Sequence, residues 1–385
     1  MSRRIAAVTV GRSDYGIYFP VLQRLQNDPD VDLQLVVAAA HLDPKYGNTV
    51  QEVECDGFPI AARVPMTMHG DSEQDVANVI GIGVQEFTSA YSNLQPEIVL
   101  VLGDRYEMFA AATAALPVRL PLAHIQGGEL TFGAIDDPIR HCITKLSHIH
   151  FAATSEYARR IRQMGEEPWR VHVTGSPAMD SIRSLESIPK STLEAEIGLD
   201  LSRTLLITYH PPTLEENQVE TVENLLGALR AAGHNLLFTG LNADARNQEF
   251  MRRMERFVET TPNARLVLNL GYRKYRNILR YVMAMVGNSS SGMIEAASFH
   301  LPVVNIGSRQ AGRVRALNVI DVDKSRDAIA QGIAKAVSSE FHNSVADIQN
   351  PYGDGHAAER IVSVLKSAKL GQELLVKKFV DYPLA

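Results

Sequence analysis

The chain has 385 residues, which is too long for one ordinary hydrophobic core and favours two domains. Its 38 Lys and Arg residues against 44 Asp and Glu residues give a net charge of −6, which argues against a nucleic-acid surface, because such a surface normally needs a basic excess. No run approaches the roughly 20 apolar residues of a membrane span, and the short apolar run near the N-terminus indicates a core strand rather than a signal peptide. We expect a cytoplasmic protein without membrane or nucleic-acid partners.

Only two cysteines are present, Cys55 and Cys142, and neither belongs to a C-x-x-C pattern. Zinc ribbons and redox pairs are therefore excluded, and a disulfide framework is implausible.

Short apolar runs alternate with longer amphipathic stretches along the whole chain. The first series of strands is expected at 4–10, 33–39, 97–103, 121–125, 148–154 and 171–175, and the second at 204–210, 235–240, 264–270, 283–288, 302–307 and 318–323. Helices are expected between them, at 17–27, 75–93, 135–147, 156–164, 217–232, 243–259, 324–339 and 356–369. Nearly continuous apolar strands separated by helices are typical of parallel sheets that are covered on both faces.

The alternation weakens once, in the Ser-rich and charged stretch 176–203, which marks a domain boundary. We therefore predict an α/β protein with two doubly wound, Rossmann-like domains that face each other across a cleft. Residues 1–180 form the N-terminal domain, residues 181–365 form the C-terminal domain, and residues 366–385 form a tail that packs back on the N-terminal domain. In such sheets ligands bind beyond the carboxyl ends of the strands, so the residues that follow each strand are the site candidates.

The turn after the first strand, GRSDYG (11–16), is neither a dinucleotide fingerprint nor a phosphate-binding P-loop, because its glycine spacing fits neither pattern. Gly11 permits the turn, and Ser13 or Asp14 can cap the next helix. Arg12 has no need to be in such a turn unless it holds an anion. Simple capping and ligand contact both remain open for this turn.

The next strand ends carry His41 and Asp104. A histidine in a turn, such as His41, is more often hydrogen-bonded within the fold than bound to a ligand. An Asp in the position of Asp104 is commonly a helix N-cap, and the alternative is that its carboxylate faces the cleft. The stretch HIQGGELTFGAIDDPIRH (124–141) then crowds three carboxylates, an Arg and two His around a Gly pair directly after a buried strand. It is either a solvated turn or a reaction site.

The second half has its own strand ends. His210 follows one strand in YHPPT (209–213), Asn242 and Asp244 follow another, and GNSSSG (287–292) leads from a strand into a helix. Small residues let a diphosphate approach the unpaired N–H groups at a helix start, although a Ser-rich N-cap is the alternative. Glu295 could accept from two sugar hydroxyls, and SRQAGR (308–313) supplies arginines that could neutralise a phosphate. This half therefore suits a nucleotide, whereas the first half offers carboxylates.

Six motifs occur together in a familiar order: HL…YGNT (41–49), GDRYE (103–107), HIQGGE…GAIDDPIRH (124–141), HPP (210–212), GNSSSG (287–292) and GSRQAGR (307–313). They closely resemble the hydrolysing UDP-N-acetylglucosamine 2-epimerases of sialic-acid-type sugar pathways, from about residue 4 to residue 361. The resemblance implies a fold of the glycosyltransferase B type, a UDP-sugar substrate, no cofactor and no metal. It implies conversion of UDP-N-acetylglucosamine (UDP-GlcNAc) and water to N-acetylmannosamine and UDP, by a homo-oligomer, either a dimer or a tetramer.

Matching positions give the residues that the resemblance implies. The catalytic candidates are Asp104, Glu129, Asp136 and His210. The substrate-binding candidates are Arg12, His41, Arg105, Gln126, Asp137, Arg140, Asn242, Asn288, Ser289, Ser290, Glu295 and Arg313. UDP is expected to be held mainly by the C-terminal domain.

One position departs from the family. Members often carry Glu between His-Ile and Gly-Gly, as a favoured acid/base, whereas this chain has Gln126. Either the proton transfer passes to Glu129 or Asp136, or Gln126 marks a subfamily with a different sugar. The related enzymes that act on UDP-N,N′-diacetylbacillosamine share the same motifs and form the first alternative. A UDP-sugar glycosyltransferase and a non-catalytic nucleotide-sugar sensor are more distant ones.

Overall fold

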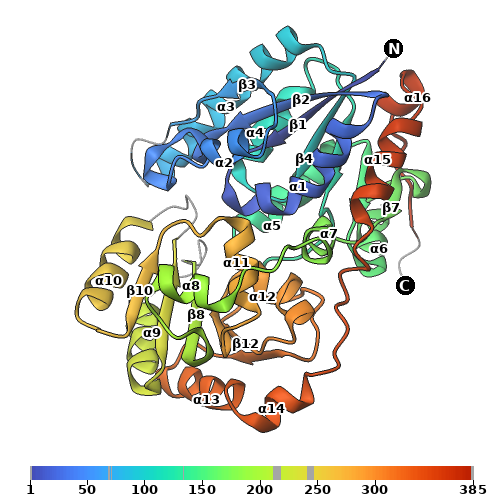
Figure 1. Ribbon diagram of the computed structural model, residues 1–385. Helices are drawn as coiled ribbons and strands as arrows, with labels where there is room; N and C mark the ends of the chain where they lie inside the picture. Colours follow the sequence, from blue (N-terminus) through green and yellow to red (C-terminus); the bar gives the residue numbers. More distant parts are fainter. Residues whose placement is uncertain are drawn as a thin grey trace. The chain divides into compact units, whose positions relative to one another are not determined.

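The computed structural model describes residues 2–67, 70, 72–132, 134–210, 218–240 and 247–382 (Figure 1). The chain forms two compact units. The first comprises Met1–Glu129, Asp136–Arg183 and Tyr352–Ala385, and the second comprises Leu130–Ile135 and Ser184–Pro351.

The first unit is built on a parallel sheet whose strand order is β3-β2-β1-β4-β5-β6-β7. Its central strands are buried and almost wholly apolar, as in EIVLVL, which is why they pair on both edges. The strands are β1 (Arg3–Thr9), β2 (Val31–Ala38), β3 (Ile60–Val64), β4 (Ile98–Leu102), β5 (Leu122–Ile125), β6 (Ile149–Ala152) and β7 (Val171–Val173). Its helices are α1 (Arg12–Asn27), α2 (Val50–Cys55), α3 (Glu73–Leu94), α4 (Tyr106–Ala115), α5 (Asp136–Leu146), α6 (Ser155–Gln163), α7 (Pro177–Arg183), α15 (Ala357–Ser367) and α16 (Gln372–Leu375).

The second unit repeats the same winding, with the strand order β10-β9-β8-β11-β12-β13. Its strands are β8 (Thr204–Thr208), β9 (Asn235–Thr239), β10 (Ala264–Val267), β11 (Ala284–Gly287), β12 (Val303–Ile306) and β13 (Val319–Val322). Its helices are α8 (Lys190–Ile197), α9 (Gln218–Ala232), α10 (Asn247–Glu259), α11 (Gly271–Leu279), α12 (Ser290–Ile294), α13 (Arg326–Ala336) and α14 (Ser339–Ser344). Short 3-10 turns complete the chain at Ala39–Leu42, Pro44–Tyr46, Pro168–Arg170, Leu201–Arg203 and Ala296–Phe299.

The predicted fold class, two α/β units with parallel sheets, is confirmed. The strand β3 was not predicted, because IAARV carries a charged Arg63 and alternates buried and exposed residues. This pattern is that of an edge strand, which pairs only with β2.

The end of the chain returns to the first unit earlier than predicted. Residues 352–365 were expected in the second domain, but they belong to the first unit. Asp180 accepts hydrogen bonds from the backbone N–H groups of Ala357 and Ala358 at 2.9 Å, so it caps the start of α15. Figure 1 shows α15 beside α1, which comes from the opposite end of the chain.

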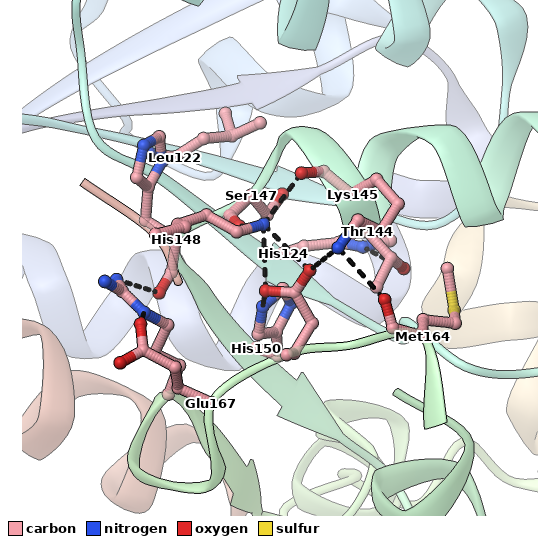
Figure 2. Close-up of polar contacts among 12 residues, drawn as sticks. Leu122, His124, Thr144, Lys145, Ser147, His148, His150, Met164 and Glu167 are labelled. Atoms are coloured by element: carbon pink, nitrogen blue, oxygen red, sulfur yellow. Dashed lines mark hydrogen bonds and ion pairs between the residues drawn. The ribbon is translucent and has the colours of Figure 1, made fainter. Parts of the chain in front are cut away.

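A buried charge cluster holds the C-terminal tail on the first unit. Lys377 Nζ donates to the carbonyl oxygens of Lys145 and Ser147 at 2.7 Å and lies 2.8 Å from Glu166, while His150 Nε2 lies 3.0 Å from Glu166 (Figure 2). Burial opposes ionisation, but the hydrogen bonds from His150, Lys145 and Lys377 hold the pKa of Glu166 at about 2. Arg170 also donates to three carbonyl groups of the tail, those of residues 373, 374 and 376.

Within the described part of the chain, no helix is long and apolar enough to cross a membrane.

Candidate active site

The carboxylate candidates of the first unit leave the sheet from two adjacent strands. β4 and β5 are parallel with Leu102 opposite Ile125, and the Gly103 N–H donates to the Ile125 carbonyl oxygen at 3.0 Å. Asp104 therefore leaves the sheet beside Gln126. β4 lies next to β1, where the strand order reverses, and β5 lies on the other side of β4. Ligands of open α/β sheets bind at this switch point.

An ion pair fixes the position of Asp104. Arg140 of α5 reaches the Asp104 carboxylate through Nη2, and its side chain is 2% exposed against 20% for Asp104. Breaking such a pair would leave a buried charge uncompensated, which is costly. The fold thus brings together two predicted site residues that lie 36 positions apart.

His124 joins the same strand end to α5. Its Nε2 lies 2.8 Å from the Gly103 carbonyl oxygen. Its Nδ1 lies 3.2 Å from Thr144 Oγ1 (Figure 2). Burial lowers the pKa of His124 to about 3. The ring is therefore neutral, with the hydrogen on Nε2 facing the carbonyl oxygen and Nδ1 accepting from the hydroxyl. His124 was not among the predicted site residues, and its signal was a polar side chain inside a buried strand.

The Gly pair lets the chain pass close to α6. Gly128 has a φ of 76°, and a Cβ atom there would lie 2.5 Å from the Tyr157 carbonyl oxygen. Glu129 follows directly and is 1% exposed, and Asp136, the first residue of α5, is also buried. The stretch is therefore no solvated turn, because two of its carboxylates are held inside the first unit.

Replacement of Gly128 by Ala should destabilise the protein more than replacement of Gly57. Both glycines have left-handed backbones, with φ near 80°, but nothing lies within 4 Å of a Cβ atom at Gly57. Gly57→Ala therefore costs only backbone strain, about 1 kcal/mol. Gly128→Ala adds a clash with a backbone oxygen and should cost about 2–4 kcal/mol in urea unfolding. Equal losses in the two variants would contradict this steric role.

Two other predicted contacts are oriented by their neighbours. Arg105 binds Glu107 in a bidentate manner, at 3.1 Å through Nε and 3.0 Å through Nη2, and its guanidinium lies over the Tyr106 ring. Asp137 lies 3.6 Å from His141 Nε2, one helical turn further along α5. Both side chains are therefore held at the switch-point edge by other residues of this unit.

The turn after β1 is closed by Asp14. Its carboxylate accepts from Thr9 Oγ1 and from the backbone N–H groups of Val10 and Gly11, at 2.8–3.0 Å. Burial raises the pKa of Asp14 to about 6. Arg12 begins α1 and is partly buried, so the capping interpretation of this turn applies to Asp14 rather than to Arg12.

The His41 ring is hydrogen-bonded within the first unit. It is fully buried, with Nε2 2.9 Å from Thr9 Oγ1 and Nδ1 2.8 Å from Thr49 Oγ1. Burial lowers the pKa of His41 to about 3, so the ring is neutral. Both nitrogens therefore have partners in the fold, and the substrate contact of His41 stays a prediction.

In the second unit, Asn288 positions His210. The His210 N–H donates to Asn288 Oδ1 at 2.7 Å, and Asn288 Nδ2 donates to the His210 carbonyl oxygen at 2.8 Å. The side-chain amide of Asn288 thus positions the backbone of His210, and its substrate contact stays a prediction. His210 follows β8, which ends at Thr208 and pairs with β11 at the switch point of this sheet.

Glu295 is held by residues that the sequence did not indicate. Arg276 Nε lies 2.7 Å from Glu295 Oε1, and Ser291 Oγ donates to Oε2 at 2.7 Å while accepting from the Tyr275 hydroxyl at 3.0 Å. Ser289 caps α12 by accepting from the Ser291 N–H, and the helix begins at Ser290. The Ser-rich turn therefore contains an N-cap, and the binding of a diphosphate there stays a prediction.

Arg313 contacts the segment between the two buried carboxylates. Its Nη2 donates to Thr131 Oγ1 at 3.1 Å, and Gly312 lies against Leu130 and Phe132. The nearby Arg309 donates to the Asn288 carbonyl oxygen at 3.1 Å. These contacts explain why residues 130–135 belong to the second unit.

Asn242 and Asp244 lie outside the described residues. Among the residues that are described, no three His, Cys, Asp or Glu side chains are grouped as ligands for a metal ion.

Known proteins are similar to this chain over nearly its whole length. The profile of a family described as UDP-N-acetylglucosamine 2-epimerase matches residues 23–366. A UDP-N,N′-diacetylbacillosamine 2-epimerase (hydrolyzing) of Legionella pneumophila is 36% identical over 98% of this chain and 99% of its own length. A UDP-N-acetylglucosamine 2-epimerase of Neisseria meningitidis serogroup B is 30% identical over 99% of this chain and 100% of its own length.

The fold is also that of solved structures. The crystal structure of a UDP-GlcNAc 2-epimerase from Neisseria meningitidis bound to UDP-GlcNAc has a TM-score of 0.80 and 21% identity, and the match covers 94% of this chain and 99% of that chain. At this identity the likeness concerns the fold alone. Together with the family profile and the two sequence relatives, it leads to one conclusion: the chain belongs to the UDP-N-acetylglucosamine 2-epimerase family.

Proposed function

We propose that the protein is a hydrolysing 2-epimerase whose substrate is UDP-N,N′-diacetylbacillosamine. The observation that carries this proposal is the 36% identity, over nearly the full length of both chains, to the Legionella enzyme named for that reaction. This reverses the order of the two substrates considered from the sequence, where UDP-GlcNAc came first.

The reaction has to break a C2–H bond that is not acidic. Loss of UDP from C1 makes this feasible, since positive charge that develops at C1 acidifies the hydrogen on C2. Elimination gives a 2-acetamidoglucal, and addition of water at C1 and of a proton at C2 on the opposite face gives the free manno sugar. This sequence needs an acid/base that can change roles and an anionic group near C1.

Asp104, Glu129 and Asp136 suit these tasks, because all three are carboxylates of the first unit on segments that leave adjacent strands or begin α5. The bond from Arg140 orients Asp104, and the contact of Gly128 with α6 fixes the backbone before Glu129. UDP would be held by Arg12, His210, Asn242, Ser289, Ser290, Glu295 and Arg313. Gln126, Arg105, Asp137 and Arg140 would line the sugar subsite or orient its carboxylates.

UDP-GlcNAc is the second candidate substrate. It is favoured by the relative of Neisseria meningitidis serogroup B, which is 30% identical and carries that name. The two sugars share the UDP group on C1, the hydrogen on C2 and the 2-acetamido group, so the same carboxylates would serve both reactions.

Incubation of the protein with each UDP-sugar in D₂O, followed by NMR, tests the proposal. UDP-N,N′-diacetylbacillosamine should yield UDP and the free manno sugar with deuterium at C2, at a higher kcat/KM than UDP-GlcNAc. A preference for UDP-GlcNAc would make the second candidate the substrate. Products without deuterium at C2 would contradict elimination, and no turnover of either compound would contradict an epimerase.

A further inference from the structure

Gln126 has a buried hydrogen-bond donor that the protein leaves without an acceptor. The side chain is 7% exposed, and its Nε2 atom is buried with no hydrogen-bond partner among the described residues. A buried donor that lacks an acceptor costs about 1–3 kcal/mol in the ligand-free protein. A fold selected only for stability has no reason to keep an amide there, because an apolar side chain of similar size would avoid this cost.

The backbone of Gln126 is also unfavourable. Its φ is 66°, which is a left-handed conformation that a residue with a Cβ atom seldom adopts. In this conformation the Gln126 N–H donates to the Phe151 carbonyl oxygen of β6 at 3.0 Å, which continues the sheet for one residue beyond β5. Unfavourable conformations of this kind cluster at binding sites, where the surrounding structure enforces them.

The position of Gln126 is that of a ligand-binding residue. It leaves the sheet beside Asp104, because Leu102 pairs with Ile125 and the Gly103 N–H donates to the Ile125 carbonyl oxygen. This is the carboxyl edge of the sheet, close to the switch point between β1 and β4. The donor is therefore buried at the edge that carries the candidate carboxylates.

The chemistry of the neighbours indicates what the donor binds. Carboxylates such as Asp104 and Glu129 only accept hydrogen bonds when ionised, so a sugar hydroxyl can satisfy itself by donating to them. An amide carbonyl oxygen is an acceptor only and cannot pair with a carboxylate. We propose that Gln126 Nε2 donates a hydrogen bond to an acetamido carbonyl oxygen of the bound sugar, and that Gln126 thereby determines specificity for acetamido sugars. This inference rests on the proposed function and deepens it.

Two variants test this role. Gln126→Met keeps the size of the side chain without the donor, and Gln126→Glu keeps its shape but replaces the donor by an acceptor. Each should lower kcat/KM for UDP-N,N′-diacetylbacillosamine by about 10-fold or more, because the substrate carbonyl loses its donor inside a buried site. The affinity for UDP alone, measured by calorimetry, should stay unchanged, and Gln126→Met should keep or raise the melting temperature of the ligand-free protein.

Gln26→Met is the control in the same unit. Gln26 is exposed and its Nε2 donates to the Gly57 carbonyl oxygen at 3.1 Å, so this variant should not raise the melting temperature and should leave kcat/KM unchanged. A purely structural role of Gln126 would lower the melting temperature and the affinity for UDP in its variants. A loss of kcat/KM without these two losses therefore indicates that Gln126 recognises the ligand.

The choice of sugar locates the carbonyl group. Equal losses for UDP-N,N′-diacetylbacillosamine and UDP-GlcNAc would assign the 2-acetamido group, which both carry, and a loss confined to the former would assign the 4-acetamido group; either result supports the proposal. Wild-type kcat/KM in both Gln126 variants would overturn the proposed role of Gln126.

If the wild-type protein turns over neither sugar, the proposed function fails. The dissociation constants of the two UDP-sugars, measured for the wild-type protein and for the Gln126 variants, then still decide the role of Gln126. Equal dissociation constants in the wild-type protein and in the variants would overturn that role.

Discussion

Exchange of Asp104 for Asn or of Glu129 for Gln is expected to lower kcat by about 10²–10⁴-fold, which is the range supplied by a positioned acid or base. Both exchanges keep the size of the side chain and remove its ability to take up a proton or to carry a negative charge next to C1. The double variant should have no measurable turnover, because residues that act as one unit do not contribute additively. Deuterium incorporation at C2, followed by NMR, measures the chemical step directly.

The control for these exchanges is Glu156→Gln. Glu156 lies in the same unit, 44% exposed, in a surface pair with Arg160 at 3.1 Å, and its exchange should leave kcat and stability nearly unchanged. Asp104→Asn removes the anionic partner of the buried Arg140, so its stability must be measured beside its activity and kcat referred to the folded fraction. Intact turnover in the double variant would remove both carboxylates from the reaction.

The second large effect is a loss of stability of the first unit in mild acid. Burial lowers the pKa of His41 and of His124 to about 3 and that of His148 to about 4, whereas an unfolded histidine has a pKa of about 6.5. These rings stay neutral in the folded state and take up protons on unfolding. Their contribution to stability is therefore complete above pH 6.5 and is lost as the pH falls from 6.5 toward 4 and 3.

Asp14 acts in the opposite direction. Burial raises its pKa to about 6, so between pH 6 and its ordinary value of 3.8 the folded protein binds a proton that the unfolded chain does not. For these four groups, the three histidines and Asp14, the net uptake on unfolding is about two protons, and burial also lowers the pKa of His150, which adds to this uptake. The free energy of unfolding should fall by at least about 2–3 kcal/mol for each pH unit between pH 6 and pH 4.5.

Fluorescence of Trp169 during urea unfolding measures this effect, since the single Trp of the chain belongs to the first unit. The variant His41→Asn should reduce the pH dependence by about one proton, or about 1.4 kcal/mol per pH unit, whatever it does to stability at pH 7.5. A free energy of unfolding that stays constant from pH 7.5 to pH 5 would show that these histidines are not held neutral.

Strands whose consecutive residues are all buried could be predicted from the sequence. A strand such as IVLVL (98–102), apolar at every position, is covered on both faces, and its place at the centre of a parallel sheet follows from that pattern. β3 was not predicted, because an edge strand is stabilised by its neighbour β2 rather than by its own apolar residues. The return of residues 352–365 to the first unit was also not predictable, since Asp180, which caps α15, lies 177 positions before Ala357.

The candidate site was predictable to the level of strand ends and no further. Asp104, Glu129, Asp136 and His210 were predicted because they follow buried strands or begin the next helix, and their catalytic roles stay predictions. The hydrogen bonds that His41 and Asn288 make within the fold were not predictable, because a histidine or an asparagine after a strand has the same local signature whether it faces a ligand or the backbone. That Gln126 Nε2 lacks an acceptor could not be predicted for the same reason.

The sequence by itself determined the order of buried strands, the polar residues that end them and the family to which the chain belongs, because each depends on residue type and spacing along the chain. Only the tertiary structure decided which of those polar groups are already paired. Arg140 finds Asp104 across 36 positions, and Asn288 finds His210 across 78. A hydrogen bond depends on distance in space, so pairs between residues this far apart along the chain are decided by the tertiary fold.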